Sequence, residues 1–283
     1  MQVNRLTLQS AVNEWKWLYI ASDIHLGEQA SDITLFKKEL QRAQEIDARV
    51  LITGDLFGMI SKKDPRYRAG GVVAELRGRD DLVNVTLDYA YEILKPYANM
   101  IDMISMGNHE IKFQSYHDTE IIGLLLDKLH DMWKEQPGKA PVHGGNVGFL
   151  QYQILLGGGS SKLYDIFYDH GSGGDAPVTK GMIGANRIRC NWGADLYILS
   201  HNHYRWADAL VHGRMNTRGH LEVREQRFIR SGNFHKSYLV RDQNHPSDID
   251  YPEEMSHSLK PLGGTFLRVR VTKKKHVEHI IEV

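Results

Sequence analysis

The chain has 283 residues, of which 41% are apolar and 25% charged, which is enough material to bury a sizeable core. This composition excludes intrinsically disordered and fibrous proteins. The formal net charge is +0, so no overall field attracts nucleic acid or an anionic membrane, and such contacts would need local patches. We expect a single domain over residues 1–283, because no linker-like segment divides the chain.

The single cysteine, Cys190, excludes an internal disulfide and any site built from several thiolates. We expect it to be a packing residue or a helix position without a catalytic role. No stretch approaches the roughly 18 apolar residues of a membrane helix, and the initial MQVNRLTLQSAVNEW lacks the basic-then-apolar pattern of a signal peptide. We therefore expect a cytoplasmic protein that has no membrane partner.

Five short apolar runs end in polar residues of types that bind ligands. Runs of this length that are bounded by Gly, Asp or Asn predict buried strands. The five runs are WLYIASDIH (17–25), VLITGD (50–55), MISMGNHE (103–110), YDIFYDH (164–170) and LYILSHNH (196–203). Polar side chains at the end of a buried strand are costly to bury unless something there binds them.

Helical spacing connects the first three runs. The helix predicted over 33–46 has its apolar face at Ile33, Phe36, Leu40 and Ala43. Further helices are predicted over 82–98 and 116–134, the second with a face at Ile121, Leu124, Leu125, Lys128 and Leu129. Alternating strands and helices predict βαβ units, in which ligands bind at the carboxyl ends of the strands.

Three other segments do not follow this pattern of alternating strands and helices. From about residue 208, alternating runs such as REQRFIRSGN, HKSYLVRD and GTFLRVRVTKKKHVEHIIEV predict mainly antiparallel strands and loops that complete the domain. Residues 242–262 predict a surface loop. The segment 61–80 has six basic residues and a Gly pair, and it is either a lid or binding loop or a solvated excursion.

Each polar strand end also has a purely structural explanation. Asp23 and His25 could form a turn with a helix cap, Asp55 could be a turn residue, and Asn108 could cap the next helix. The histidines of SHNH (200–203) could be a surface pair. That explanation must hold at five separate strand ends, whereas a metal site explains all of them with one cause.

The ligand types and their spacing favour a metal site. In Asp23-x-His25 and His201-x-His203, the period of an extended chain would place both side chains on the same side. Carboxylate, imidazole and amide ligands without thiolate suit Mn, Fe or Zn better than Ca. The set is large enough for two ions about 3.5–4 Å apart that share one carboxylate, an arrangement used to hydrolyse phosphate esters.

Five motifs, in this order along the chain, resemble those of the calcineurin-like metallophosphoesterase family. They are S-D-I-H-L-G (22–27), G-D-L-F (54–57), G-N-H-E (107–110), D-H-G (169–171) and S-H-N-H (200–203). The resemblance covers residues 17–203. It implies an α/β fold, a four-layer α/β/β/α sandwich with two mixed β-sheets.

The resemblance also implies a role for each motif residue. One metal would be held by Asp23, His25 and His203 and the other by Asn108, His170 and His201, with Asp55 bridging the two. His109 would face the phosphate as general acid or charge stabiliser, and Glu110 would orient its ring. The implied reaction is in-line attack by a metal-bridging hydroxide, with two divalent ions, Mn as first choice and Fe or Zn as alternatives.

Two departures from the protein phosphatases of the family bear on the substrate. Those members carry Arg in G-D-x-x-D-R-G and in R-G-N-H-E, whereas this chain reads G-D-L-F-G-M-I and has Met106 before Gly107. Guanidinium groups bind a phosphomonoester dianion bidentately, so their absence favours a phosphodiester such as DNA or a nucleotide. Gly58 replaces a common acidic residue, which removes one expected contact to a ligand histidine. Ser200 and Asn202 also differ from the usual residues of the last motif.

Residues near the predicted rim are candidates for further substrate contacts, with an ordinary solvated side chain as the favoured alternative for each. The basic candidates are Arg66, Arg68, Lys180, Arg187, Arg189 and Arg205. His235 lies in SGNFHKS, which resembles a loop that often returns toward the site in relatives. Two other functions stay open. One is a phosphomonoesterase that acts on a small metabolite. The other is a non-catalytic scaffold, although scaffold proteins of this fold usually lose metal-ligand residues and this chain keeps all of them.

Overall fold

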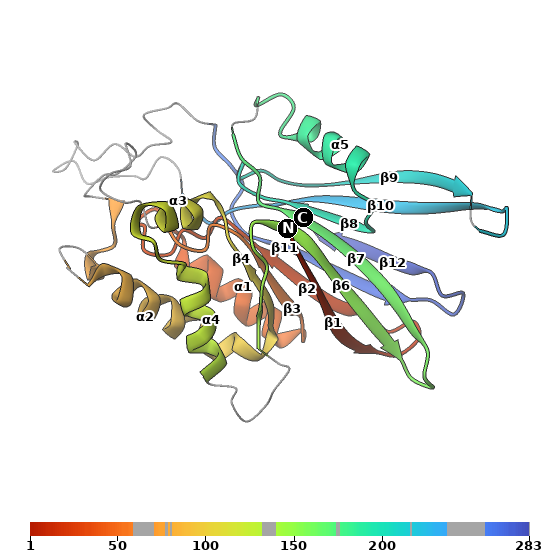
Figure 1. Cartoon of the computed structure of the whole chain (residues 1–283), viewed down its shortest axis with the longest axis horizontal. Coiled ribbons are helices and arrows are strands. Elements are labelled where there is room, and N and C mark those ends of the chain that lie inside the picture. The colour runs from red at the N-terminus through yellow and green to blue at the C-terminus, as the bar shows by residue number, and fades with distance from the viewer. Residues whose placement is uncertain are drawn as a thin grey trace.

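The computed structural model describes residues 1–58, 71–76, 79, 81–131, 140–173, 176–215, 217–236 and 258–282. Two six-stranded sheets pack against each other. The helices α1 to α4 cover the outer face of one sheet, and α5 lies over the other (Figure 1). The predicted four-layer α/β/β/α sandwich is therefore confirmed.

The sheet under α1 to α4 has the strand order β12-β11-β2-β3-β4-β5. Its strands are β2 (Lys16–Ala21), β3 (Arg49–Thr53), β4 (Ile101–Ser105), β5 (Val142–His143), β11 (Thr265–Val271) and β12 (Val277–Glu282). Strands β2 to β5 pair in parallel, and β11 is antiparallel to both β2 and β12. Helices α1 (Ile33–Glu45) and α2 (Leu82–Leu94) connect the parallel strands, as predicted for βαβ units.

The second sheet has the order β1-β6-β7-β8-β10-β9. Its strands are β1 (Gln2–Ser10), β6 (Val147–Leu156), β7 (Ser161–Asp169), β8 (Leu196–Leu199), β9 (Arg205–Met215) and β10 (Leu221–Ser231). The pairs β6–β7 and β9–β10 are antiparallel, and the others are parallel. Both sheets are mixed, as predicted, although strands β1 and β6 were not expected from the sequence.

The core lies in three layers that follow the alternation of side chains along each strand. On β2, Leu18 and Ile20 face the other sheet, whereas Tyr19 and Ala21 face the helices. The outer face of the second sheet packs Phe167 and Tyr197 near Ala185 of α5 (Met182–Asn191). Because strands such as β2 are buried on both faces, they read as continuous apolar runs in the sequence.

The helix predictions need two corrections. The segment predicted as one helix over 116–134 contains the end of α3 (Asn108–His117) and the helix α4 (Ile121–Asp131). Asp118 separates them because its left-handed backbone, with φ of 49°, ends α3. The buried residues of α4 are Ile121, Ile122, Leu125, Leu126 and Leu129, so Leu124 and Lys128 were wrongly placed on the buried face.

The helix predicted over 82–98 ends at Leu94 and continues as a 3₁₀ helix over Lys95–Met100. Pro96 lies at the start of that segment, where it cannot donate an α-helical hydrogen bond. In contrast, the predicted apolar face of α1 is confirmed, with Phe36, Leu40 and Ala43 buried.

The C-terminal strands predicted from their alternation are confirmed as β10, β11 and β12, each in antiparallel pairing. The predictions for 237–257 and for most of 61–80, including Arg66 and Arg68, lie outside the described residues. Cys190 is exposed on α5, so it is a helix position and not a packing residue. None of the helices in the described part of the chain has the length and apolar character needed to cross a membrane.

Candidate metal centre

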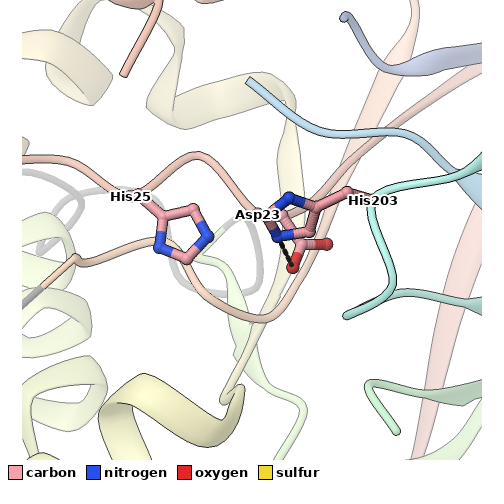
Figure 2. A group of neighbouring side chains, drawn as sticks. All are labelled: Asp23, His25 and His203. Atoms are coloured by element: carbon pink, nitrogen blue, oxygen red, sulfur yellow. Dashed lines mark ion pairs between the residues drawn. The ribbon is translucent and has the colours of Figure 1, made fainter. Parts of the chain in front are cut away.

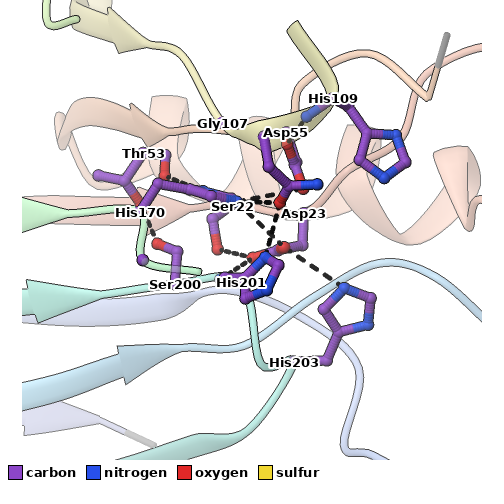
Figure 3. A network of polar contacts seen from close by, with 12 residues as sticks. Ser22, Asp23, Thr53, Asp55, Gly107, His109, His170, Ser200, His201 and His203 are labelled. Carbon is purple, nitrogen blue, oxygen red and sulfur yellow. Dashed lines mark hydrogen bonds and ion pairs between the residues drawn. The ribbon is translucent and has the colours of Figure 1, made fainter. Parts of the chain in front are cut away.

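Polar loops that follow five strands, three from one sheet and two from the other, meet at one place (Figure 3). The structure brings together all seven side chains predicted to bind metal. Asp23 and His25 follow β2, Asp55 follows β3, Asn108 begins α3 after β4, His170 follows β7, and His201 and His203 follow β8. The carboxyl ends of parallel strands therefore gather these residues, as the topology predicts.

The backbone at the site is not extended, which corrects the reasoning for the D-x-H and H-x-H spacings. Five predicted ligands have positive φ: Asp23 at 51°, His25 at 54°, Asp55 at 49°, His201 at 70° and His203 at 59°. This left-handed region is uncommon for residues other than Gly, although Asp and His enter it more readily than most. Strained backbone of this kind clusters at functional sites, where surrounding contacts hold it in place.

The first ligand group consists of Asp23, His25 and His203 (Figure 2). Their ligand atoms lie within 4.8 Å of one another, and His203 Nε2 is 3.3 Å from Asp23 Oδ1. Within the described residues, both ring nitrogens of His25 are buried without a hydrogen-bond partner. Because such a group costs about 1–3 kcal/mol, these orphaned atoms fit a bound cation.

The second ligand group consists of Asp55, His170 and His201, whose ligand atoms also lie within 4.8 Å. The Asn108 amide oxygen joins this group, since it lies 2.6 Å from His201 Nδ1 and 3.2 Å from His170 Nε2. His170 Nδ1 lies 3.1 Å from the Thr53 carbonyl oxygen, which can only accept a hydrogen bond. That contact directs His170 Nε2 toward Asp55 Oδ2, at 3.1 Å.

Asp55 lies between the two ligand groups. Its Oδ2 faces His170, while its Oδ1 accepts the backbone N–H of His109 at 2.9 Å. Its carbonyl oxygen accepts the backbone N–H of His25 at 3.1 Å, which ties it to the loop of the first group. A Cβ at Gly107 would lie 2.1 Å from Asp55 Oδ1, so only glycine allows this approach. The position of Asp55 fits the bridging role that the motif implies.

Glu110 is buried and accepts three backbone N–H groups, from Asp55 at 3.2 Å, Phe57 at 2.8 Å and Gly107 at 2.7 Å. These contacts tie the loop after β3 to the start of α3. The structure thus gives Glu110 a different role from the predicted orientation of the His109 ring. Burial, followed by the nearby Asp55 carboxylate, raises the pKa of Glu110 to about 7.

A chain of buried hydroxyl groups lies beneath the ligands. Ser22 Oγ donates to Asp23 Oδ2 at 2.6 Å and lies 2.6 Å from Ser231 Oγ. Ser200 Oγ lies 3.1 Å from Ser231 Oγ and 2.9 Å from Thr53 Oγ1. Ser200, one of the departures in the last motif, is therefore a member of a hydrogen-bonded network that supports Asp23.

The weaker sequence candidates separate into two kinds. His235 lies at the site, since its ring centroid is 5.4 Å from that of His25. Arg187 is exposed on α5 and has no hydrogen bond or ion pair with a site residue within the described ranges. Arg205 donates to the carbonyl oxygen of Leu262 at 2.8 Å. The geometry therefore supports His235 as a site residue more than either arginine.

Opposite charges determine the protonation of the second ligand group. Burial alone would lower the pKa of His170, but the carboxylates of Asp55 and Asp23 raise it to about 10. Burial alone would raise the pKa of Asp55, but His170 and His109 hold it well below its usual range. A cation bound by His170 Nε2 must therefore replace a proton.

We expect metal binding to tighten as the pH rises. His170 carries its extra proton at every pH below about 10, so each pH unit from 6 to 8 should strengthen binding roughly tenfold per proton released. Titration calorimetry with Mn²⁺, in two buffers of different ionisation enthalpy, measures both the affinity and the proton release. His130→Gln, on the exposed surface of α4, should titrate as the wild type does, whereas His170→Gln should lose the dependence. An affinity that does not change between pH 6 and 8 would contradict this expectation.

Sequence reasoning missed Glu28, which lies five residues after Asp23 in the same loop. Its Oε2 is 3.1 Å from His235 Nε2, and its side chain is 15% exposed. The sequence feature that could have indicated Glu28 is Gly58, which stands where the motif commonly has an acid. A carboxylate from elsewhere in the chain could then take the place of that acid.

Two mixed sheets with candidate metal-ligand groups at their strand ends are consistent with the fold of metal-dependent phosphoester hydrolases. The sequence matches the model of the calcineurin-like phosphoesterases over residues 17–236, and the chain belongs to this family. The family uses divalent metals, and the ligand groups described above are suited to hold them. No curated protein matches the sequence.

Three solved structures share remote similarity. A predicted phosphoesterase from Streptococcus pneumoniae has a TM-score of 0.31 and 11% identity, covering 95% of this chain and 99% of its own. Vps29 from Chaetomium thermophilum has a TM-score of 0.34 and 11% identity, covering 94% and 92%. A metallophosphoesterase from Sphaerobacter thermophilus has a TM-score of 0.35 and 14% identity, covering 94% and 88%. These TM-scores are too low to say anything about the activity of this chain.

Proposed function

We propose that this chain is a phosphodiesterase that hydrolyses nucleic acid or a nucleotide with two divalent cations, Mn²⁺ being the first choice. One observation carries the proposal: two ligand groups meet at Asp55, with the buried ring of His109 beside them. His109 lies within 4.8 Å, atom to atom, of Asp55 and His25. A group that acts on a phosphate held by the cations would need this position.

The cations, when bound, lower the pKa of a water molecule and neutralise charge on the attacking and leaving oxygens. The residues of the chain orient the ligands and transfer the proton. Asp55 and Asn108 orient the imidazoles around them through the contacts given above. The water oxygen forms a bond to phosphorus while the bond to the leaving oxygen breaks with its electron pair. His109 protonates that oxygen, and the proton lost by the water returns to His109 through solvent.

The preference for a diester rests on the charges around the ligands. Within the described residues, the cationic groups that most lower the pKa of Asp23 and Asp55 are histidines. The residue before the third motif is the largely buried Met106. A monoester dianion carries one more negative charge than a diester and benefits most from guanidinium donors. If the site has no such donors beyond the described residues either, it discriminates less against the singly charged diester.

The test compares two chromogenic esters with Mn²⁺ present. We expect kcat/KM for bis(p-nitrophenyl) phosphate to exceed that for p-nitrophenyl phosphate by at least about tenfold, equivalent to about 1.4 kcal/mol of transition-state preference. A preference for the monoester would instead support the phosphomonoesterase alternative. A subsequent screen of single-stranded DNA, duplex DNA, RNA and cyclic nucleotides identifies the natural class.

The scaffold alternative predicts a different result. A non-catalytic relative has no need for seven ligand side chains, yet this chain keeps them all. If the protein binds no transition metal and cleaves neither ester with any added divalent ion, the scaffold is the better account. Metal content measured on protein purified without chelator separates the two.

A further inference from the structure

The carboxylate of Glu28 is surrounded by three imidazoles. Its Oε1 lies 3.9 Å from His25 Nδ1 and 3.9 Å from His109 Nδ1, and its Oε2 lies 3.1 Å from His235 Nε2. The Glu28 side chain is only 15% exposed. Within the described residues, its Oε1 is buried without a hydrogen-bond partner, so that oxygen is available to the two rings it faces.

Gly58 is the reason that Glu28 can reach this place. A Cβ added at Gly58 would lie 2.3 Å from Glu28 Cγ and 2.6 Å from both its Cδ and its Oε1. The carboxyl group of Glu28 therefore occupies the volume that a side chain at position 58 would enter. Position 58 is the one where the second motif of relatives commonly has an acid, so the charge is present here but comes from the loop after β2.

Backbone contacts fix Glu28 in this position. Its N–H donates to the carbonyl oxygen of His25 at 3.0 Å, and its own carbonyl oxygen accepts the Ser31 N–H at 3.1 Å. Ser31 pairs with His235 in an isolated antiparallel β-bridge. The Gly58 N–H donates a hydrogen bond to the Leu26 carbonyl oxygen at 3.0 Å. The loop after β2, the loop after β3 and the segment around His235 are thus joined around one carboxylate.

We propose that Glu28 is the positioning residue for His109, which it orients in place of the acid that position 58 lacks. This inference rests on the proposed function. A carboxylate that accepts a hydrogen bond from Nδ1 fixes the orientation of the ring and directs Nε2 toward the substrate. His235, on the other oxygen, holds the carboxylate in its orientation. The present separation of 3.9 Å is expected to shorten when substrate is bound, since such contacts tighten in the reacting complex.

Two esters with different leaving groups test the inference. Protonation of the leaving oxygen matters most when that oxygen leaves poorly, so diphenyl phosphate depends on His109 more than bis(p-nitrophenyl) phosphate does. We expect Glu28→Gln to lower kcat for diphenyl phosphate by roughly 10²-fold and for the activated ester by about tenfold or less, with KM little changed. The variant should keep the metal content of the wild type. Glu39→Gln is the matched control, since Glu39 is a partly buried carboxylate that accepts from Tyr19 and Gly264 away from the site.

A second pair of variants separates the role in catalysis from a role in folding. In the background of His109→Ala, Glu28→Gln should have almost no further effect on kcat, because the two residues act as one unit. Moving the acid should restore activity: Glu28→Ala/Gly58→Asp should recover at least about tenfold over Glu28→Ala.

Three results would overturn the inference. Equal losses on both esters would mean that Glu28 does not act through His109, and loss of metal would mean that it acts through the ligand His25. A double variant no better than Glu28→Ala would mean that positions 28 and 58 do not share a role. A wild-type protein that cleaves neither ester would instead contradict the proposed function, so the two failures are distinguishable.

Discussion

Asp55→Asn is expected to lower kcat by about 10³-fold or more and to reduce the metal content by at least one ion. Asp55 lies between the two ligand groups and belongs to one of them directly. The substitution keeps the size of the side chain but removes its charge and places an amide within reach of His170 Nε2, now 3.1 Å from Asp55 Oδ2. Metal ions supply several kcal/mol of charge stabilisation, and about 4 kcal/mol corresponds to 10³-fold in rate.

Metal content by mass spectrometry and unfolding temperature with and without EDTA provide readouts besides activity. A bound cation stabilises the folded state, so EDTA should lower the unfolding temperature of the wild type and have little effect on Asp55→Asn. Asp195→Asn is the matched control, because Asp195 precedes β8 at the end opposite to His201 and accepts the Asp165 N–H at 2.9 Å. A variant at Asp55 with two bound ions and normal turnover would exclude the bridging role.

The sequence predicts the elements that carry the site better than the rest of the fold. Strands β2, β3 and β4 are buried on both faces, so each reads as an apolar run that stops at its ligand residues. In β6, by contrast, buried residues alternate with partly buried ones, and this period-2 pattern is more easily missed. Strand β1 pairs with β6 in parallel, with Gln2 beside Gly148, and no local pattern indicates a contact between segments so far apart in the chain.

The side chains that the structure gathers as candidate ligands were named from the sequence, but the backbone geometry that brings them together was not predicted. The D-x-H and H-x-H spacings indicate an extended chain, whereas the backbone of Asp23 and His201 is left-handed. That conformation persists because contacts from other loops hold it, such as the hydrogen bond from the His201 N–H to Asp23 Oδ2 at 3.1 Å. The place of Glu28 at the site was not predicted from the sequence for a similar reason. Its side chain occupies space that is free only because position 58 is glycine.

His109 belongs to a third group of close polar atoms, with His25 and Asp55, so its position alone allows either a catalytic or a ligand role. The two roles make opposite predictions for metal content. A ligand would lose metal on truncation, whereas a general acid would leave both ions bound. The His109 N–H, which donates to Asp55 Oδ1 at 2.9 Å, is a backbone group and survives truncation of the side chain.

His109→Ala is therefore expected to lower kcat by about 10²- to 10⁴-fold while both metal ions are retained. The loss should be larger for diphenyl phosphate than for bis(p-nitrophenyl) phosphate, because a poor leaving group needs the proton more. His117→Ala is the matched control, since His117 lies at the exposed end of the same helix and stacks on Phe113. Steady-state kinetics with metal analysis on the same samples decide the matter. Full activity in His109→Ala would remove this residue from the mechanism, and loss of metal would make it a ligand.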